Sequence, residues 1–529
     1  MTIETLDYAS ISQLSRTDVA YAGSDPLLRP FYQYPVELKG FEQVFADKAK
    51  DDCDRALLVQ TLQEQYSAFD DFPKVRKNIN SLLQDNCFTV ITAHQPNLLL
   101  GPLYFVYKIM GVIRLSKVLN DKYPSRKVVP MFVIGGEDHD FEEVNHIQLF
   151  NKKLVWENNE KGSVGMMNTS SLVSVLDELQ KILGESENAK EIFELISKNY
   201  RGFSEYHTAT QGLLNDIFGR FGLVVINMNS VALKRRFIPH MVREITEQTS
   251  HQLVTTTQDR LQALGFKPQA FPREINLFYL QPQLRERIVF DGEFYTVLNT
   301  DIRFTSSEIL SEINKHPEYF SPNVVMRPMY QEFIIPNLAY IGGGGELAYW
   351  LERKTQFESF GINFPMLIRR NSILWIDEAG VQKMAKLELE ANELFMEVEL
   401  LIKNYVVKHS AVTIDLSSEK VVLEQTYNSV EKLAVSIDST LEKVVAAEKV
   451  KLLQGLEILE AKMIKAEKNK QDTAIQQIRT LVQKYCPNGG LQERTDNFLP
   501  YYIKYGPDFF DQLLQICDPL KKGFIVVKA

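Results

Sequence analysis

The chain has 529 residues, of which 45% are hydrophobic and 24% charged, with a net charge of −9. This length exceeds a single hydrophobic core and predicts two or three domains. The negative charge argues against a nucleic-acid partner. The four cysteines form no C-x-x-C pair, the N-terminus lacks an apolar signal segment, and the most apolar window, 97–115, is interrupted by Lys108 and Arg114. We therefore expect a cytoplasmic protein with no membrane span.

The first pattern in chain order is a strand, a helix and a second strand within residues 87–150. Apolar runs at 88–93 and 128–134 flank a helix-like segment at 103–119. This order predicts a βαβ unit of an α/β fold, with parallel strands buried on both faces. Ligands of such sheets bind beyond the carboxyl ends of the strands. Two polar segments fall there, His94–Gly101 and Glu137–Asp140, and we expect the chemistry between them.

Two more buried strands and a hairpin are expected further along the chain. Apolar runs at 222–226 and 365–368 each stop at polar residues, as parallel strands do. Short strands at 288–290 and 294–297 flank Asp291-Gly292, a hairpin-turn sequence. The α/β region therefore extends to about residue 376.

From about residue 377 the composition changes to Glu/Lys-rich helical periodicity, and glycine and proline nearly vanish until Pro487. Apolar residues recur three or four apart, which predicts a coiled coil: Val430, Leu433, Ile437, Leu441, Val444, Leu452, Leu456, Leu459 and Met463. One unbroken helix over 418–485 would be about 100 Å long. It would need partner helices: 378–407, joined antiparallel through a turn at 408–417, and a second subunit.

These patterns divide the chain into three parts. We expect an α/β core over 1–376, an antiparallel coiled-coil dimerisation domain over 377–487, and a tail over 488–529 that returns to the core. A homodimer is expected because the apolar stripe needs a partner.

The acidic cluster Glu137-Asp138-His139-Asp140 is the first candidate site. Three carboxylates and an imidazole beyond a buried strand repel one another unless they bind something, and such crowding suits a general base or a cation site. The alternative is a helix N-cap at Asp138 or Asp140. No metal ligand set is predicted, because no further histidine cluster lies nearby in sequence.

The turn His94-Gln95-Pro96-Asn97 is the second candidate. Backbone amides at the start of the helix after Gly101-Pro102 could hold a phosphate or carboxylate, with Lys108 one turn inside. A plain connecting turn is the alternative.

The glycine run 342–345 before Glu346 is the third candidate. Four glycines at a helix start allow close approach of a ligand, although the run matches neither a P-loop nor a dinucleotide fingerprint. Arg369, Arg370 and Asn371 at a strand end could bind an anion or form a solvated turn. Arg327 and Gln331 belong to the same neighbourhood.

At these residues the chain resembles the bacillithiol-biosynthesis enzymes that add cysteine, the BshC family of cysteine ligases. The matching segments are H-Q-P-N-L-L-L-G-P-L-Y-F-V-Y-K from His94, G-G-E-D-H-D-F-E-E-V-N-H at 135–146, and R-P-M-Y-Q-E-F-I-I-P-N-L-A-Y-I-G-G-G-G-E-L-A-Y-W at 327–350. The coiled coil and the tail segments Q-E-R at 492–494 and Y-I-K-Y-G at 502–506 also fit. The resemblance covers essentially the whole chain.

The resemblance implies a Rossmann-like core related to class I nucleotidyltransferases, a connector region that shares residues 1–376 with this core, and a coiled-coil dimerisation domain. The implied reaction joins L-cysteine to the free amine of glucosaminyl malate as an amide, in the last step of bacillithiol biosynthesis. Amide formation needs an activated carboxylate, for which ATP is the usual agent, and the sequence leaves the cosubstrate open. Class I nucleotidyltransferases carry H-x-G-H where this chain has His94-Gln95-Pro96-Asn97.

The resemblance also implies roles for individual residues. One of Asp138, His139 or Asp140 would deprotonate the sugar ammonium. The expected substrate-binding residues are His94, Gln95, Gly101, Tyr104, Lys108, Glu137, Asn145, Arg327, Gln331, Glu346 and Tyr349. The expected nucleotide- or anion-binding residues are Gly342, Gly343, Gly344, Arg369, Arg370 and Asn371.

Two other functions compete with this one. The first is an adenylate-forming ligase or nucleotidyltransferase that acts on another acid and amine. The second is a non-catalytic coiled-coil scaffold with an inert α/β head, for which the acidic cluster would be dispensable.

Overall fold

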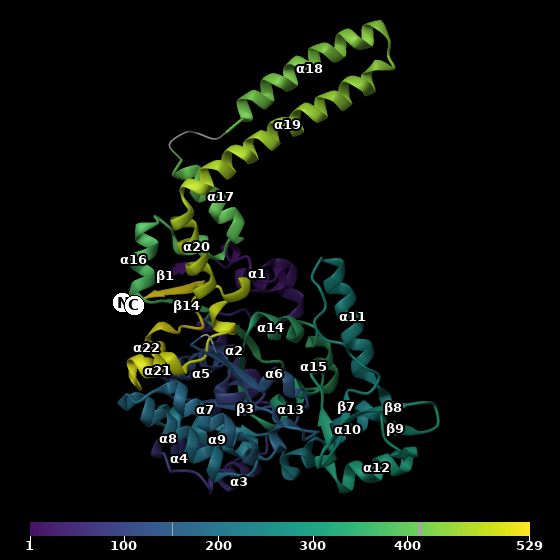
Figure 1. Cartoon of the computed structure of the whole chain (residues 1–529). Helices are drawn as coiled ribbons and strands as arrows, with labels where there is room; N and C mark the ends of the chain where they lie inside the picture. Colours follow the sequence, from purple (N-terminus) through teal and green to yellow (C-terminus); the bar gives the residue numbers. More distant parts are fainter. Residues whose placement is uncertain (151, 411–414) are drawn as a thin grey trace.

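A computed structural model describes residues 1–150, 152–410 and 415–529 as an α/β body from which a helical arm projects (Figure 1). The body is built on a five-stranded sheet in which all pairs are parallel. Its strands, in spatial order, are β13 (Met366–Arg369), β12 (Asn337–Gly342), β2 (Cys87–His94), β3 (Lys127–Ile134) and β6 (Val224–Asn227). This confirms the expected α/β class and the βαβ unit, whose helix is α5 (Leu103–Lys122).

Apolar side chains alternate between the two faces of this sheet, so both faces are buried. Phe132 points towards α5, where it meets Phe105, while Met131 and Val133 point into a second core on the opposite face. The helices that contribute to the first core are α5, α7 (Val173–Leu183), α8 (Glu187–Gly202), α9 (Tyr206–Phe218), α21 (Leu499–Tyr505) and α22 (Asp508–Ile516). The second core is formed mainly by α3 (Arg55–Tyr66), α4 (Pro73–Ser81), α10 (Val231–Glu247), α13 (Arg327–Ile334), α14 (Gly344–Leu351) and α15 (Lys354–Phe360).

A second, antiparallel sheet packs into that second core and reaches the carboxyl end of β3. Its strands, in spatial order, are β10 (Arg303–Phe304), β9 (Tyr295–Val297), β8 (Leu284–Phe290), β7 (Leu277–Gln281) and β11 (Phe320–Pro322). β8 and β9 form the expected hairpin, with Phe290 opposite Tyr295. Helices α11 (Thr249–Ala263) and α12 (Ser306–Lys315) flank this region (Figure 1).

The two ends of the chain meet in a third sheet, which sequence reasoning missed. β1 (Thr2–Leu6) runs antiparallel to β15 (Phe524–Lys528), and β15 runs parallel to β14 (Ile373–Ile376). The two chain ends lie together beside this sheet in Figure 1. Other elements of the body include α1 (Arg16–Gly23), α2 (Phe41–Lys48), α6 (Phe141–Val144) and the antiparallel pair of β4 (His146–Leu149) and β5 (Lys152–Val155).

The segment 418–485 does not form one unbroken helix. The segment forms three helices, α18 (Ser417–Ile437), α19 (Leu441–Lys470) and α20 (Asp472–Tyr485), and α18 folds back antiparallel on α19 to make the arm (Figure 1). The chain turns at Asp438, whose carboxylate accepts hydrogen bonds from the Thr440 amide (2.8 Å) and hydroxyl (2.9 Å). A local side-chain acceptor of this kind starts a new helix although the apolar spacing continues across it.

The expected helix over 378–407 is also divided, into α16 (Glu378–Lys386) and α17 (Val398–Lys408), which pack with α20 at the base of the arm. Residues 411–414 of the expected turn at 408–417 lie outside the described residues. Within the described part of the chain, no helix is both long and apolar enough to span a membrane.

Candidate active site

A pocket of about 580 Å³ opens beyond the carboxyl ends of β2, β3 and β12, where ligands of parallel sheets bind. Its wall brings together segments far apart in sequence: the turn after β2, the acidic cluster after β3 and the glycine run after β12. The glycine run and the acidic cluster therefore share one pocket, a question the sequence left open. The sequence-predicted residues that line it are His94, Gln95, Tyr104, Asp138, Asp140, Arg327, Gln331, Gly343, Glu346, Tyr349 and Arg370.

The other predicted residues are not part of the pocket wall, and most are engaged elsewhere. Glu137 pairs with the buried Lys234 at 2.5 Å, and Asn145 hydrogen-bonds His146. Gly101 adopts a positive φ of 59° in a turn held by Asn497. The full set outside the wall is Gly101, Lys108, Glu137, His139, Asn145, Gly342, Gly344, Arg369 and Asn371.

Lys108 lies behind the pocket wall and binds two residues that line it, Glu346 and Ala93. Its ammonium donates to both carboxylate oxygens of Glu346 (2.7 and 2.9 Å) and to the carbonyl of Ala93 (2.6 Å). Glu346 also accepts from the Tyr340 hydroxyl and the Gly343 amide, each at 2.8 Å. Since Lys108 is fully buried and its three protons are used, it has none left for a substrate anion.

The glycine run is shaped by packing inside the protein. The Gly343 amide is capped by Glu346, and a Cβ at Gly344 would overlap the Asp18 carboxylate. Arg369 binds that carboxylate through two hydrogen bonds, at 2.6 and 2.9 Å. Arg369 therefore neutralises Asp18, and the Gly343 amide is not available to a phosphate.

Arg370 forms a second buried pair, with Glu493 of the segment that follows α20. Two parallel hydrogen bonds of 2.8 and 2.9 Å join the guanidinium and the carboxylate, whose side chains are 4% and 1% exposed. Burial raises the pKa of Glu493, but the charges of Arg370 and Arg369 and the hydrogen bonds from Arg370 and the Ile373 amide together outweigh this effect and lower it overall. The Nε of Arg370 has no protein acceptor, and Arg370 lines the pocket.

His94 is a neutral imidazole at the end of β2. Burial, followed by the charge of Lys108, lowers its pKa to about 4. Its Nδ1–H donates to the carbonyl of Gln95 (3.1 Å), so Nε2 accepts from the Tyr104 hydroxyl (3.1 Å). His94 therefore offers no positive charge to a bound anion.

Asp138 is clamped by two arginines. Arg285 of β8 and Arg327 of α13 each donate to its carboxylate at 3.3 Å. Burial raises the pKa of Asp138, but the two positive charges outweigh this effect and lower it well below the usual range. The same Arg285 donates to Nδ1 of His139 at 2.6 Å, and that imidazole turns towards Phe278. The two ion pairs make the Asp138 carboxylate a poor proton acceptor near neutral pH, and the Nδ1 lone pair of His139 is occupied by Arg285.

Two carboxylates of the cluster are left facing the pocket, those of Asp140 and Glu143. Asp140 occupies the N-cap position of α6, yet its side chain makes no capping hydrogen bond. Partial burial of the carboxyl group, followed by the negative charges of Asp140 and Asp138, raises the pKa of Glu143. A carboxylate with a raised pKa in a pocket has the properties of a general base.

Sequence reasoning missed three residues of this site. Glu143 was visible only as part of the acidic run, and nothing in the sequence separates it from Glu142. Arg285 lies in a strand of the second sheet, 147 residues from Asp138. Arg494 lines the pocket from the far end of the chain. Only the fold brings these residues together.

The comparison with known proteins agrees with this architecture. A family model described as "Bacillithiol biosynthesis BshC, N-terminal Rossmann-like domain" matches residues 1–371, and the corresponding C-terminal coiled-coil model matches residues 373–529. The chain belongs to the BshC family. The expected resemblance, the Rossmann-like core and the coiled-coil domain are thereby confirmed.

Curated relatives of the chain carry the name "Putative cysteine ligase BshC". The relative from Flavobacterium johnsoniae is 40% identical over 529 residues, with both chains covered completely. That from Christiangramia forsetii is 39% identical and covers 100% of this chain and 99% of its own. A more distant relative from Bacillus cereus is 25% identical and covers 94% of each chain. These names agree with the expected enzyme class, a ligase.

Proposed function

We propose that this BshC-family protein is a cysteine ligase of bacillithiol biosynthesis, which joins the carboxyl group of L-cysteine to the amine of glucosaminyl malate in the last step. The observation that carries the proposal is the pair of carboxylates, Asp140 and Glu143, that face a pocket also lined by arginines. An acidic wall suits a substrate ammonium, and a basic wall suits carboxylates. The names of the relatives supply the substrate class.

Glu143 is the general base in this proposal. An amine attacks a carboxyl carbon only when neutral, so the sugar ammonium must first lose a proton. Asp138 is committed to Arg285 and Arg327, and His139 accepts a hydrogen bond from Arg285 outside the pocket. Glu143 lines the pocket and has a raised pKa, which brings its affinity for protons closer to that of an amine.

The chemical step then balances as follows. The ammonium proton passes to the Glu143 carboxylate, and the free nitrogen attacks the activated carboxyl carbon of cysteine. A carbon–nitrogen bond forms, the bond from that carbon to the activating group breaks, and the leaving group departs with the bonding electrons. The nitrogen, positively charged after the attack, gives its second proton to the leaving group, so that a neutral amide remains. The negative charge of Asp140 attracts the substrate ammonium to the pocket. Arg327 keeps the nearby Asp138 ionised.

We also propose ATP as the agent that activates the cysteine carboxyl group. The residues expected to hold its phosphates do not fit this task well, because Gly343, Arg369 and Arg370 are engaged inside the protein. Asn371 donates to the carbonyl of Asp518 and is buried. We therefore derive no step through ATP.

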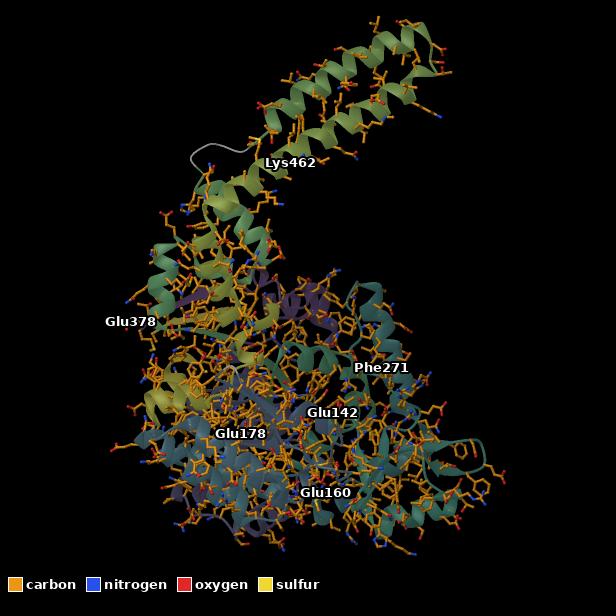
Figure 2. All side chains as sticks on the ribbon, viewed as in Figure 1. Glu142, Glu160, Glu178, Phe271, Glu378 and Lys462 are labelled. Carbon is orange, nitrogen blue, oxygen red and sulfur yellow. The ribbon has the colours of Figure 1, made fainter. Side chains whose placement is uncertain are left out.

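The arm is the proposed dimerisation surface. Large apolar side chains of α18 and α19 are exposed along the pair, including Leu433 at 64% and Ile437 at 75% exposed. Figure 2 shows side chains projecting outward from both arm helices, on which Lys462 is labelled. Two helices alone leave these residues in water, so a second copy of the chain is the partner that would cover them.

Deletion of the gene tests the proposed pathway step. We expect thiol profiling of the deletion strain to show loss of bacillithiol with accumulation of glucosaminyl malate. An unchanged profile would contradict the proposal and favour ligation of another acid and amine. If a variant in which Glu137–Asp140 are replaced restores the normal thiol profile of the deletion strain, the result would favour the non-catalytic coiled-coil scaffold.

Substitution of Glu143 tests the assignment of the base. We expect Glu143→Gln to lower kcat by about 10²–10⁴-fold. In the native enzyme the acidic limb of the kcat/KM profile should lie above the ordinary glutamate pKa of about 4.3, because Glu143 must be ionised to accept the proton. The matched control is Glu142→Gln (labelled in Figure 2), since the neighbouring Glu142 lies outside the pocket wall. Equal losses in the two variants would remove Glu143 from the mechanism.

A further inference from the structure

Arg494 lines the catalytic pocket but belongs to the segment that follows the arm. Neighbouring contacts hold this segment in place: Glu493 binds Arg370, Gln492 bonds both backbone groups of Trp375, and Asn497 donates to the turn at Gly101. The Arg494 guanidinium itself forms no ion pair or hydrogen bond with any residue in the described ranges. Arg494 is exposed at the pocket, while its neighbours Gln492, Glu493 and Asn497 are buried, so the backbone fixes its position and its guanidinium is free to bind an anion.

The surroundings of Arg494 are suited to an anion. Both Arg494 and Arg370 act electrostatically on the Tyr104 phenol, which places them at the same part of the pocket. The Nε–H of the buried Arg370 has no acceptor in the protein. His94 is neutral, Lys108 and Arg369 are used inside the protein, and the guanidinium of Arg370 is paired with Glu493. Arg494 is therefore the arginine at this part of the wall whose charge is free for a ligand.

The acidic and basic groups lie at different strands of the sheet edge. Arg370 follows β13, and Asp140 and Glu143 follow β3, with β12 and β2 between them. Three strand spacings of about 4.8 Å separate the two ends by roughly 14 Å. A substrate with an ammonium at one end and anionic groups at the other matches this division of charge.

We propose that Arg494 forms an anion subsite that holds the anionic part of a substrate, while Asp140 and Glu143 receive the amine. This inference rests on the proposed ligase function and deepens it. The anion is either the carboxylates of the malate group or the phosphates of the activating nucleotide. In both cases the segment after the coiled coil completes the active site, and Arg494 determines which substrates bind.

The test is Arg494→Gln in the full-length protein, with Arg494→Lys as the conservative variant. Arg201→Gln is the control, because Arg201 is a surface arginine in a loose 3.5 Å pair. Equilibrium binding is measured for three probes: glucosaminyl malate, methyl glucosaminide (which lacks the carboxylates) and ATP. Loss of a charge-assisted hydrogen bond predicts a weakening of about 10- to 100-fold for the anionic probe, partly restored by lysine.

The pattern of loss identifies the anion. Weaker binding of glucosaminyl malate alone, with unchanged methyl glucosaminide, assigns the malate carboxylates. Weaker binding of ATP alone assigns the phosphates. Equal binding of all three probes by wild type and Arg494→Gln, with an unchanged melting temperature, would overturn the proposal.

Kinetics separates this inference from the proposed function. In an active ligase, Arg494→Gln should raise KM for the affected substrate and change kcat by less than about threefold, because the subsite lies away from the base. If the wild-type protein forms no amide, the ligase proposal fails, and the binding measurements still decide whether Arg494 holds an anion.

Discussion

The buried pair of Arg370 and Glu493 makes a quantitative prediction about stability. The Glu493 carboxylate accepts four hydrogen bonds: two from Arg370, one from the Ser372 hydroxyl at 3.0 Å and one from the Ile373 amide at 3.1 Å. Glu493→Gln keeps one oxygen, so about two of these bonds and the neutralising charge are lost. Hydrogen bonds to charged groups contribute about 1.5–3 kcal/mol each. Breaking a buried ion pair by removing one partner costs about 3–5 kcal/mol. The hydrogen-bond estimate and the ion-pair estimate therefore agree that Glu493→Gln lowers the free energy of unfolding by about 3–5 kcal/mol.

The assay is urea unfolding followed by circular dichroism and tryptophan fluorescence, with Glu4→Gln as the matched control. Glu4 pairs with Lys528 at 2.9 Å, but their side chains are 36% and 28% exposed. Such exposed pairs contribute about 0–1 kcal/mol. We expect a clear fall in the unfolding midpoint for Glu493→Gln and almost none for Glu4→Gln. Equal midpoints in the two variants would refute the reasoning that the segment after the arm is anchored through this pair.

Three further predictions concern the glycine run, pH and the arm. Gly344→Ala should lower the melting temperature, because its Cβ would overlap a paired carboxylate, whereas Gly345→Ala should not, since no atom lies within 4 Å of its Cβ. Burial raises the pKa of Glu244 to about 7, so the folded state binds the proton more tightly, and the free energy of unfolding should fall as pH rises from about 4.5 to 7, with a flatter slope in Glu244→Gln. Leu433→Glu should convert a dimer into a monomer in sedimentation, and Lys432→Glu should not.

The parallel core was predictable because its strands are buried on both faces. The apolar runs at 88–93 and 128–134 became β2 and β3, and the polar turns after them line one pocket. The rule that ligands bind at the carboxyl ends of parallel strands predicted the position of this pocket. This prediction needed only local patterns and the geometry of one βαβ unit.

The rest of the fold depended on contacts that the sequence does not show. The apolar stripe of the arm continues across Asp438, so its periodicity could not reveal the turn that a single carboxylate stabilises. The pairing of β1 with β15 joins residues more than 500 positions apart. Such long-range pairing leaves no local signal in either strand.

The candidate site shows the same division. The sequence predicted which strand ends would carry charged residues, but it did not predict which of these residues form ion pairs with one another. Lys108 and Arg369 were expected to bind anions and instead pair with Glu346 and Asp18. The pKa of Glu143 is raised by partial burial and then by the charges of Asp140 and Asp138, and the burial depends on the folded turn.

The most direct test of the account is the ligation reaction itself with purified protein. The protein is incubated with L-cysteine, glucosaminyl malate and ATP, and the products are analysed by mass spectrometry. The account predicts a cysteine-dependent amide whose mass equals the sum of the two substrates less one water, formed by wild type and Glu142→Gln and nearly absent with Glu143→Gln. An amide formed at the same rate by Glu143→Gln, or no amide from the wild-type protein, would contradict it.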